Sequence, residues 1–306
     1  MPTKEGVRVR AKTLGRQCDT YPLRSLPIDI YRAGIPAVDG LRPDKRVRGG
    51  VKLLDPARPL ERFWERLAAA RERLLVLDYD GTLAPFTTHR DDAILYPGIA
   101  PILLDLQRQG TRIAFVTGRP AEELARRLPL SAVEIFGAHG HEHLAADGTL
   151  TRAPLTPPAR EWLDEAAARI GALGFAGALE RKHGTVAIHW RREDQDGQAR
   201  LMALAADLTQ GLPEELHGLP FDGGYEFRTR GRDKGTAIAA LSARHPQAIM
   251  AYLGDDLTDE DAFAALPHDG LAVLVRAEPR PSRAHLWLRP PDELRGFLSA
   301  WMAAAP

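Results

Sequence analysis

The sequence is poor in cysteine, in long apolar runs and in net charge, and each shortage excludes a class of protein. Its single cysteine, Cys18, excludes an internal disulfide and fits a reducing compartment. No apolar stretch reaches 18 residues and none resembles a secretory leader, so we expect a cytoplasmic protein without a membrane partner. Lys plus Arg and Asp plus Glu number 41 each, so no bulk charge attracts nucleic acid.

Residues 1–58 also lack the hydrophobic periodicity of a helix or a strand. Pairs such as Arg42-Pro43 and Asp55-Pro56 interrupt any helix, and basic side chains outnumber acidic ones by 13 to 6. We therefore predict a basic N-terminal extension that is flexible or loosely packed. A docking arm for nucleic acid or a partner protein is the alternative, but the interleaved aromatic residues of a nucleic-acid platform are missing.

From residue 59 onward the sequence alternates between strand-like and helix-like segments. The first half of this pattern contains strands at 74–78, 112–117 and 133–137, with helices at 98–109 and 120–128 between them. The pattern returns near the end with helix 234–244, strand 248–254, helix 259–266 and strand 271–275. Such βαβ units favour an α/β fold with a doubly wound, Rossmann-like parallel sheet, here assigned to residues 59–152 and 229–306.

Residues 153–228 interrupt this alternation with a different order of elements. Pro157-Pro158 opens a helix that reaches about residue 170, and a second helix spans about 197–210. Between and after them lie strand-like runs, one with the alternating apolar residues Val186, Ile188 and Trp190. We predict a smaller α+β domain inserted into the sheet domain.

Two carboxylates, Asp78 and Asp80, follow the apolar strand 74–78. Open α/β sheets bind their ligands at the carboxyl ends of central strands, where these aspartates should lie. Two anions so close together need a cation or a proton, which indicates a metal-assisted reaction centre. The alternative is an ordinary Asp-Gly turn after a strand, and the rest of the sequence argues against it.

Three further polar clusters follow, or open, elements of the predicted sheet domain. They contain Thr117, Lys234 and the acidic group Asp255, Asp256 and Asp259. Each alone has a structural explanation, because such residues commonly cap helices or lie in solvent. Together they supply what phosphoryl transfer needs: a nucleophile, a hydroxyl, a fixed cation and a carboxylate cluster for Mg²⁺.

These motifs carry a resemblance to a known family. Asp78-Tyr-Asp-Gly-Thr82, Thr117, Lys234 and Gly254-Asp-Asp-Leu-Thr-Asp259 resemble, in order and spacing, the four motifs of haloacid-dehalogenase-like (HAD) phosphatases. Within that superfamily the chain resembles the trehalose-6-phosphate phosphatases over residues 59–303. This closer resemblance rests on Gly137-Ala-His-Gly-His-Glu142, Glu180-Arg-Lys182, His189-Trp-Arg191 and Glu226-Phe-Arg228. Trp190 departs from the tyrosine common in the family, and residues 1–58 have no counterpart in its minimal domain.

The resemblance implies a role for each residue of the core motifs. Asp78 is expected to attack phosphorus, and Asp80 to protonate the leaving oxygen and then activate water. Mg²⁺ is expected on Asp78, the Asp80 backbone carbonyl and Asp255. Asp256 or Asp259 would complete its site through water or hold Lys234. The phosphoryl group is expected to be bound by Thr117 and Lys234 together with Gly81, Thr82, Gly118 and Arg119.

The inserted domain is expected to act as a cap that closes over the site and binds the sugar. The residues assigned to sugar binding are Lys182, Arg191, Glu226 and Glu142, because charged hydrogen bonds discriminate well among hydroxyl-rich ligands. The alternating histidines His139, His141 and His143 could share a strand face as metal ligands. A Gly-rich loop beside the cap explains them without a second metal.

The function predicted from this sequence is Mg²⁺-dependent hydrolysis of trehalose 6-phosphate to trehalose and phosphate, with a functional link to a trehalose-phosphate synthase. Two alternatives remain. One keeps the chemistry but changes the substrate to sucrose phosphate, a glucosylglycerate phosphate or another phosphorylated sugar or polyol. The other is a non-catalytic, phosphosugar-binding regulatory subunit, which has no need of the two aspartates and the lysine.

Overall fold

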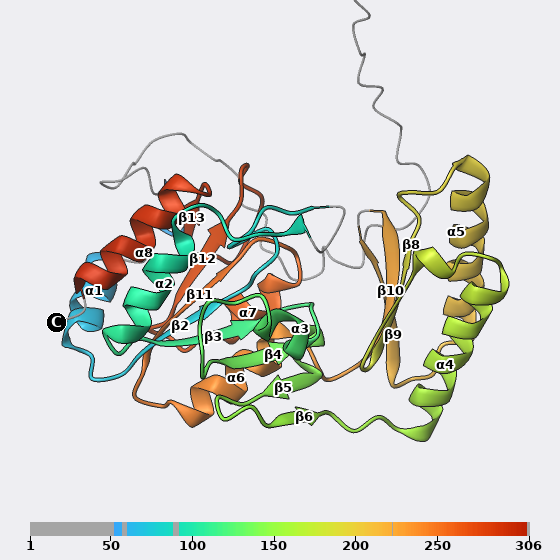
Figure 1. Cartoon of the computed structure of the whole chain (residues 1–306), viewed down its shortest axis with the longest axis horizontal. Coiled ribbons are helices and arrows are strands. Elements are labelled where there is room, and N and C mark those ends of the chain that lie inside the picture. Colours follow the sequence, from blue (N-terminus) through green and yellow to red (C-terminus); the bar gives the residue numbers. More distant parts are fainter. Residues whose placement is uncertain (1–51, 57–59, 88–91, 222, 305–306) are drawn as a thin grey trace, which may run out of the picture. The chain divides into compact units, whose positions relative to one another are not determined.

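In the described part of the chain, nine strands form one mixed sheet (Figure 1). The computed structural model describes residues 52–56, 60–87, 92–221 and 223–304. The strands, in their order across the sheet, are β1 Lys52–Leu53, β13 Leu286–Leu288, β12 Leu271–Val275, β11 Ile249–Gly254, β2 Arg73–Leu77, β3 Arg112–Val116, β4 Glu134–Gly137, β5 Glu142–Leu144 and β6 Leu150–Arg152.

The six central strands are parallel, which confirms the predicted doubly wound α/β sheet. Both edges depart from that prediction, because β1, β5 and β6 pair antiparallel with their neighbours. The chain adds β3 and β4 on one side of β2 and β11 to β13 on the other, so the strand order reverses at β2. Ligands bind at such a reversal in open α/β sheets.

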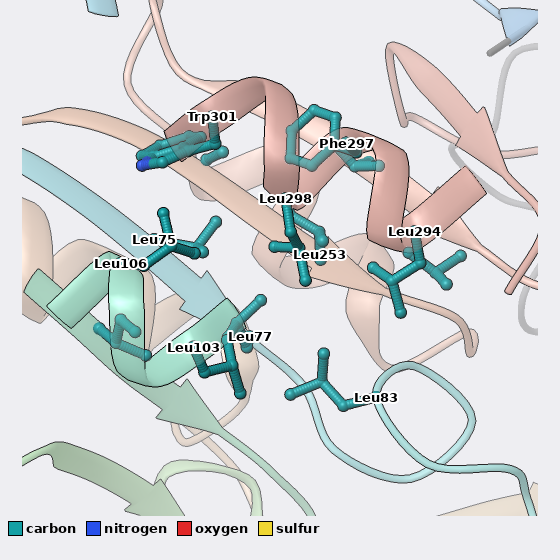
Figure 2. Close-up of a cluster of buried hydrophobic side chains, with 14 of the residues drawn as sticks. Leu75, Leu77, Leu83, Leu103, Leu106, Leu253, Leu294, Phe297, Leu298 and Trp301 are labelled. Carbon is teal, nitrogen blue, oxygen red and sulfur yellow. The ribbon is translucent and has the colours of Figure 1, made fainter. Parts of the chain in front are cut away.

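Strand β2 forms because its five residues are buried on both faces. Leu75 and Leu77 face a cluster that includes residues of α2 (Ile99–Arg108) and α8 (Asp292–Ala304) (Figure 2). Leu74 and Val76 belong to a second cluster, with residues of α6 (Lys234–Arg244) and α7 (Asp259–Ala265). Truncation of one of them, for example Leu75→Ala, should cost about 2–5 kcal/mol of stability. The helices of this domain are α1 Leu60–Ala69, α2 Ile99–Arg108, α3 Ala121–Ala125, α6 Lys234–Arg244, α7 Asp259–Ala265 and α8 Asp292–Ala304.

A second sheet in the described residues has four antiparallel strands in the order β7-β8-β10-β9. Two long helices pack on one of its faces against Val186, Ile188 and Phe227 (Figure 1). Its elements are α4 Pro157–Ala172, β7 Leu179–Lys182, β8 Thr185–His189, α5 Gln195–Gln210, β9 Leu216–Phe221 and β10 Gly224–Thr229. We call this group the cap sheet and its helices. The predicted domain bounds 153–228 stay a prediction.

Most of the N-terminal extension, predicted over residues 1–58, lies outside the described residues. Within residues 52–56 the structure has the two-residue strand β1, paired with β13, an element that we did not predict. No helix in the described ranges is long and apolar enough to cross a membrane.

Candidate active site

Asp78 lies directly after β2, at the carboxyl end of the central strands. Its backbone N–H donates to the Leu253 carbonyl at 2.9 Å, which continues the pairing of β2 with β11. Its carboxylate is buried, and Oδ2 lies 3.2 Å from Nζ of Lys234. The structure therefore brings together the first and third predicted motifs, which are 156 residues apart.

Lys234 is the first residue of α6, and a capping box fixes that helix start. The Asp233 carboxylate accepts from the Thr236 N–H at 2.7 Å, while the Thr236 hydroxyl accepts from the Asp233 N–H at 3.1 Å. Nζ of Lys234 donates to Asp259 Oδ1 at 2.7 Å. Burial lowers the pKa of Lys234, but Asp259 and Asp78 outweigh it and hold that pKa well above its ordinary value. Lys234 is thus a fixed, permanently charged cation beside Asp78.

Asp259 organises the loop between β11 and α7. Besides Lys234, the Tyr252 hydroxyl donates to its Oδ1, and Oδ2 accepts from the backbone N–H groups of Asp255 and Asp256 at 3.0 and 2.8 Å. Both oxygens of Asp259 are therefore already engaged. Of the two roles left open by the sequence, the geometry supports the one in which Asp259 holds Lys234.

Asp78, Asp255 and Asp259 offer carboxylate oxygens within 4.8 Å of one another. Burial, together with the neighbouring carboxylates, raises the pKa of Asp78 to about 7 although Lys234 opposes this, and it raises the pKa of Asp255 well above its ordinary value. A divalent cation would remove this cost, and oxygen ligands of this kind suit Mg²⁺. Since Asp259 is engaged elsewhere, the carboxylates that fit as ligands are Asp78 and Asp255, and the role of the Asp80 backbone carbonyl stays a prediction.

Asp256 does not join this group, contrary to one of the expected roles. Its side chain is exposed, and Oδ1 accepts from the Leu257 N–H at 2.7 Å. The reason is local, because the turn that aims Asp255 inward directs the next residue outward.

Gly81 and Thr82 support Asp255 from the first motif. A Cβ on Gly81, whose φ is +80°, would lie 2.1 Å from Asp255 Oδ2, so only glycine leaves room for this carboxylate. The Thr82 hydroxyl donates to Asp255 Oδ1 at 3.2 Å. The predicted phosphate-binding pair thus also positions the carboxylate that fits the metal.

Asp80 pairs with Arg119 in a bidentate ion pair. Nε and Nη2 of Arg119 lie 2.7 and 2.6 Å from the two Asp80 oxygens, and Nη1 lies 2.6 Å from Glu123 Oε1. Arg119 is buried, whereas Asp80 and Glu123 are each partly exposed, so solvent screens these contacts in part. We expected Arg119 to bind the phosphoryl group, but in the structure its guanidinium orients Asp80. The Thr117 hydroxyl, also buried, accepts from the Arg119 N–H at 3.2 Å.

Lys182 and Glu226 of the cap sheet meet the loop that carries Thr117 and Arg119. Nζ of Lys182 donates to the Gly118 carbonyl at 3.2 Å and lies 3.7 Å from Glu226 Oε1. Two residues that we did not assign to sugar binding join them: Glu180 lies 3.5 Å from Lys182, and His139 lies 3.9 Å from Glu226. Glu180 shares a strand face with Lys182, which the i, i+2 spacing of these residues could have revealed.

Glu142 has a structural role in this structure, whereas the predicted role of Arg191 in sugar binding stays a prediction. The buried Glu142 carboxylate accepts from the Ala121 N–H at 2.8 Å and pairs with Arg152 at 3.1 Å, so it supports the start of α3. Arg191 follows β8 and packs over Gly223, where a Cβ would lie 2.7 Å from its Nε. Arg191 therefore lies against the β9–β10 hairpin.

The three alternating histidines have different partners in the structure, and their role stays a prediction. His139 lies in the tight turn η3 Ala138–Gly140 with a φ of +55°, and burial, aided by Lys182, holds its pKa well below the ordinary value. His141 contacts the Ala138 carbonyl at 2.8 Å and the Thr229 hydroxyl. His143 pairs with Glu134 at 2.6 Å.

Comparison with known proteins gives one family. The family model described as trehalose-phosphatase matches residues 76–290. A trehalose-phosphate phosphatase of Mycobacterium tuberculosis (strain H37Rv) is 33% identical over 221 residues, which are 68% of this chain and 54% of that protein. A protein of the same strain described as an uncharacterized glycosyl hydrolase is 32% identical over 251 residues, which are 77% of this chain and 18% of that protein. The chain thus spans about half, or less, of the length of these relatives.

A solved structure shows the fold of this chain. The C-terminal domain of C. albicans trehalose-6-phosphate phosphatase superposes with a TM-score of 0.65 at 21% identity, covering 83% of this chain and 99% of that one. The haloacid-dehalogenase-like fold expected from the motifs is therefore confirmed.

Proposed function

This chain belongs to the trehalose-phosphatase family, and from this premise we propose that it hydrolyses trehalose 6-phosphate to trehalose and phosphate with the help of Mg²⁺. One observation carries the proposal: Asp78 has the Lys234 ammonium 3.2 Å away and shares a 4.8 Å cluster with Asp255. A nucleophilic carboxylate, a fixed cation and a second carboxylate at one strand end are what phosphoryl transfer requires.

In the first step, Asp78 attacks phosphorus as the bond from phosphorus to the sugar oxygen breaks. The products of this step are an aspartyl-phosphate and the free sugar, whose oxygen receives a proton from Asp80. In the second step, Asp80 takes a proton from water while the water oxygen attacks phosphorus. Phosphate leaves, and Asp78 returns to its carboxylate form.

Arg119 sets the geometry of Asp80 in both steps. The bidentate pair suits the second step, because the ionised carboxylate is the form that accepts a proton. The first step needs a protonated Asp80, which accepts fewer hydrogen bonds, so the pair must loosen on one side before protonation of the leaving oxygen.

Acid–base help alone is too small for this reaction. Enzymes accelerate phosphate-monoester hydrolysis by up to about 10²¹-fold. One positioned acid or base supplies about 10²–10⁴. Mg²⁺ bound by Asp78 and Asp255 would neutralise charge on the phosphoryl oxygens and keep both carboxylates ionised. Lys234 and the backbone N–H groups that follow Asp78 supply further positive potential.

A phosphate-release assay tests the proposal. The purified chain is offered trehalose 6-phosphate, sucrose 6-phosphate, a glucosylglycerate phosphate and glucose 6-phosphate, each with Mg²⁺ and each after EDTA treatment. We expect the highest kcat/KM for trehalose 6-phosphate and its loss with EDTA. Efficient phosphate release from another phosphorylated sugar, with none from trehalose 6-phosphate, would show that the other sugar phosphate is the substrate. No release from any substrate, combined with sugar-phosphate binding, would favour the regulatory subunit.

The functional link to a trehalose-phosphate synthase and the cytoplasmic location stay predictions from the sequence. Co-purification of the chain with a synthase from its own cells would test the first of them.

A further inference from the structure

One face of the cap sheet carries polar side chains, whereas the opposite face packs against α4 and α5. Along each strand, residues alternate between the two faces. Three rows of cross-strand neighbours lie on the polar face. The first contains Lys182, Thr185, Arg228 and His217, the second contains Glu180, Ala187, Glu226 and Leu219, and the third contains His189, Gly224 and Phe221.

The third row presents an aromatic ring to solvent. Phe221 is 37% exposed, although phenylalanine is usually buried. Its ring lies across Gly224, because a Cβ on Gly224 would lie only 1.9 Å from Cζ of Phe221. The centroids of the Phe221 and His189 rings are 5.0 Å apart. Glycine in the middle of the row thus leaves space for the aromatic pair.

The aromatic pair contacts the polar side chains of the second row through His189. Nε2 of His189 lies 2.9 Å from Glu180 Oε2, and Glu180 lies 3.5 Å from Lys182. Lys182 in turn donates to the carbonyl of Gly118. Gly118 lies in the loop between Thr117 and Arg119, and Arg119 pairs with Asp80. A series of contacts therefore connects the 117–119 loop, through Lys182, Glu180 and the His189 ring, to the exposed ring of Phe221.

This sequence of groups matches the chemistry of a sugar longer than one ring. Carboxylates and ammonium groups bind sugar hydroxyls, while the negative face of an aromatic ring attracts the C–H groups on the face of a pyranose. Successive rows are about 7 Å apart along the strands. Glu226 lies one row from the third row and on the strand next to Phe221, so a sugar ring bound by Glu226 leaves the next ring of the same ligand near Phe221.

We propose that Phe221, supported by His189, is a stacking subsite for the sugar ring that does not carry the phosphate. The subsite rests on the function proposed above and adds the basis of its specificity: it selects disaccharide phosphates over monosaccharide phosphates. Phe221 contributes binding of the leaving group and takes no part in proton or phosphoryl transfer.

The test compares Phe221→Ala with the parent on trehalose 6-phosphate and glucose 6-phosphate, both with Mg²⁺. We expect KM for trehalose 6-phosphate to rise about tenfold with kcat little changed, because an aromatic contact of this size is lost. Both constants for glucose 6-phosphate should stay the same. Phe221→Trp should restore KM, since it keeps an aromatic face. Met202→Ala removes another exposed apolar side chain, from α5, and should leave kcat and KM unchanged for both substrates.

The outcomes separate this inference from the proposed function. An unchanged KM for trehalose 6-phosphate in Phe221→Ala, or an equal rise for both substrates, would overturn the subsite while leaving the phosphatase intact. A parent enzyme that ignores trehalose 6-phosphate contradicts the proposed function instead. The same comparison would then use sucrose 6-phosphate, and a parent that accepts monosaccharide phosphates alone would overturn the subsite as well.

Discussion

The core cluster, Asp78, Lys234, Asp255 and Asp259, and the polar face of the cap sheet contain the same kinds of groups held in different ways. In the core, Lys234 and Asp259 are buried, and their ion pair has a length of 2.7 Å. On the cap face, Lys182 lies 3.5 Å from Glu180 and 3.7 Å from Glu226. The core charges therefore form a close, hydrogen-bonded ion pair, whereas the ion pairs of the cap face are longer, and we expect these to rearrange more readily when a ligand binds.

In the proposed reaction, this difference gives the two regions different tasks. Fixed charges in a dry site stabilise a transition state at no cost of reorganisation, which suits the phosphoryl group. Looser charged groups beside an exposed ring suit a sugar, whose many hydroxyls are matched by rearranging hydrogen bonds. Changes in the core should consequently affect kcat, and changes on the cap face should affect KM and substrate preference.

The largest effect should come from Asp78→Asn. An amide cannot accept the phosphoryl group, so we expect turnover to fall by on the order of 10⁴-fold or more, as when other enzymes lose a nucleophile. Steady-state phosphate release measures it, and circular dichroism checks that the fold is retained. Asp256→Asn is the matched control, because this exposed carboxylate lies outside the cluster. Comparable losses in both variants would contradict the distinction between them.

The second effect concerns the orientation of Asp80. Arg119→Lys loses the bidentate geometry, so we expect kcat to fall roughly 10²–10³-fold while KM changes less. Arg127→Lys is the control, since Arg127 also lies near Glu123, at 3.7 Å. If Arg119→Lys kept the kcat of the parent, the proposed role of Arg119 in orienting Asp80 would be wrong.

A smaller effect is expected on the cap face. Lys182→Ala should lower kcat/KM for trehalose 6-phosphate roughly 10- to 100-fold through KM, because a charged hydrogen bond to the sugar is lost. The control is Arg181→Ala. Arg181 is the neighbour of Lys182 on the strand and pairs with Asp164 at 2.5 Å, so this variant should have the kcat/KM of the parent. If Lys182→Ala lowered kcat alone, the assignment of this face to substrate binding would be wrong.

The smallest effect concerns His141, which contacts Thr229, the last residue of β10. Burial lowers the pKa of His141 from 6.5 to about 4. Between pH 6.5 and pH 4, His141 is protonated in the unfolded chain but neutral in the folded chain. The free energy of unfolding is therefore highest above pH 6.5 and decreases as the pH falls toward 4. This group should cost about 2 kcal/mol between pH 7 and 5.

Urea unfolding at pH 7 and pH 5 measures this cost in the parent and in His141→Asn. The variant should lose less stability over this interval, because its side chain does not titrate. The same loss in both proteins would place the pH sensitivity in other groups, such as His217, whose pKa burial also lowers to about 4.

The sequence predicted the core far better than the cap face, for a physical reason. An uninterrupted apolar run such as residues 74–77 has few alternatives to a buried strand, and the chemistry of Asp78 and Lys234 requires specific residues at specific positions. The Asp80–Arg119 pair was not predicted because its geometry is set by the packing of the segments that follow β2 and β3. Glu142 was assigned to the wrong role because a carboxylate that supports a helix start resembles one that binds a ligand. Phe221 escaped notice because its significance lies in its exposure.

The central claim is that Asp78 accepts the phosphoryl group while Asp80 handles the proton. Its most direct test uses Asp80→Asn with p-nitrophenyl phosphate, whose leaving group needs no acid, so that the first step proceeds and the second is slowed. After acid quenching and digestion, mass spectrometry should find the phosphoryl group on the peptide that contains Asp78, and none in Asp78→Asn/Asp80→Asn. Phosphorylation of a different residue, or turnover that persists in the double variant, would contradict the account.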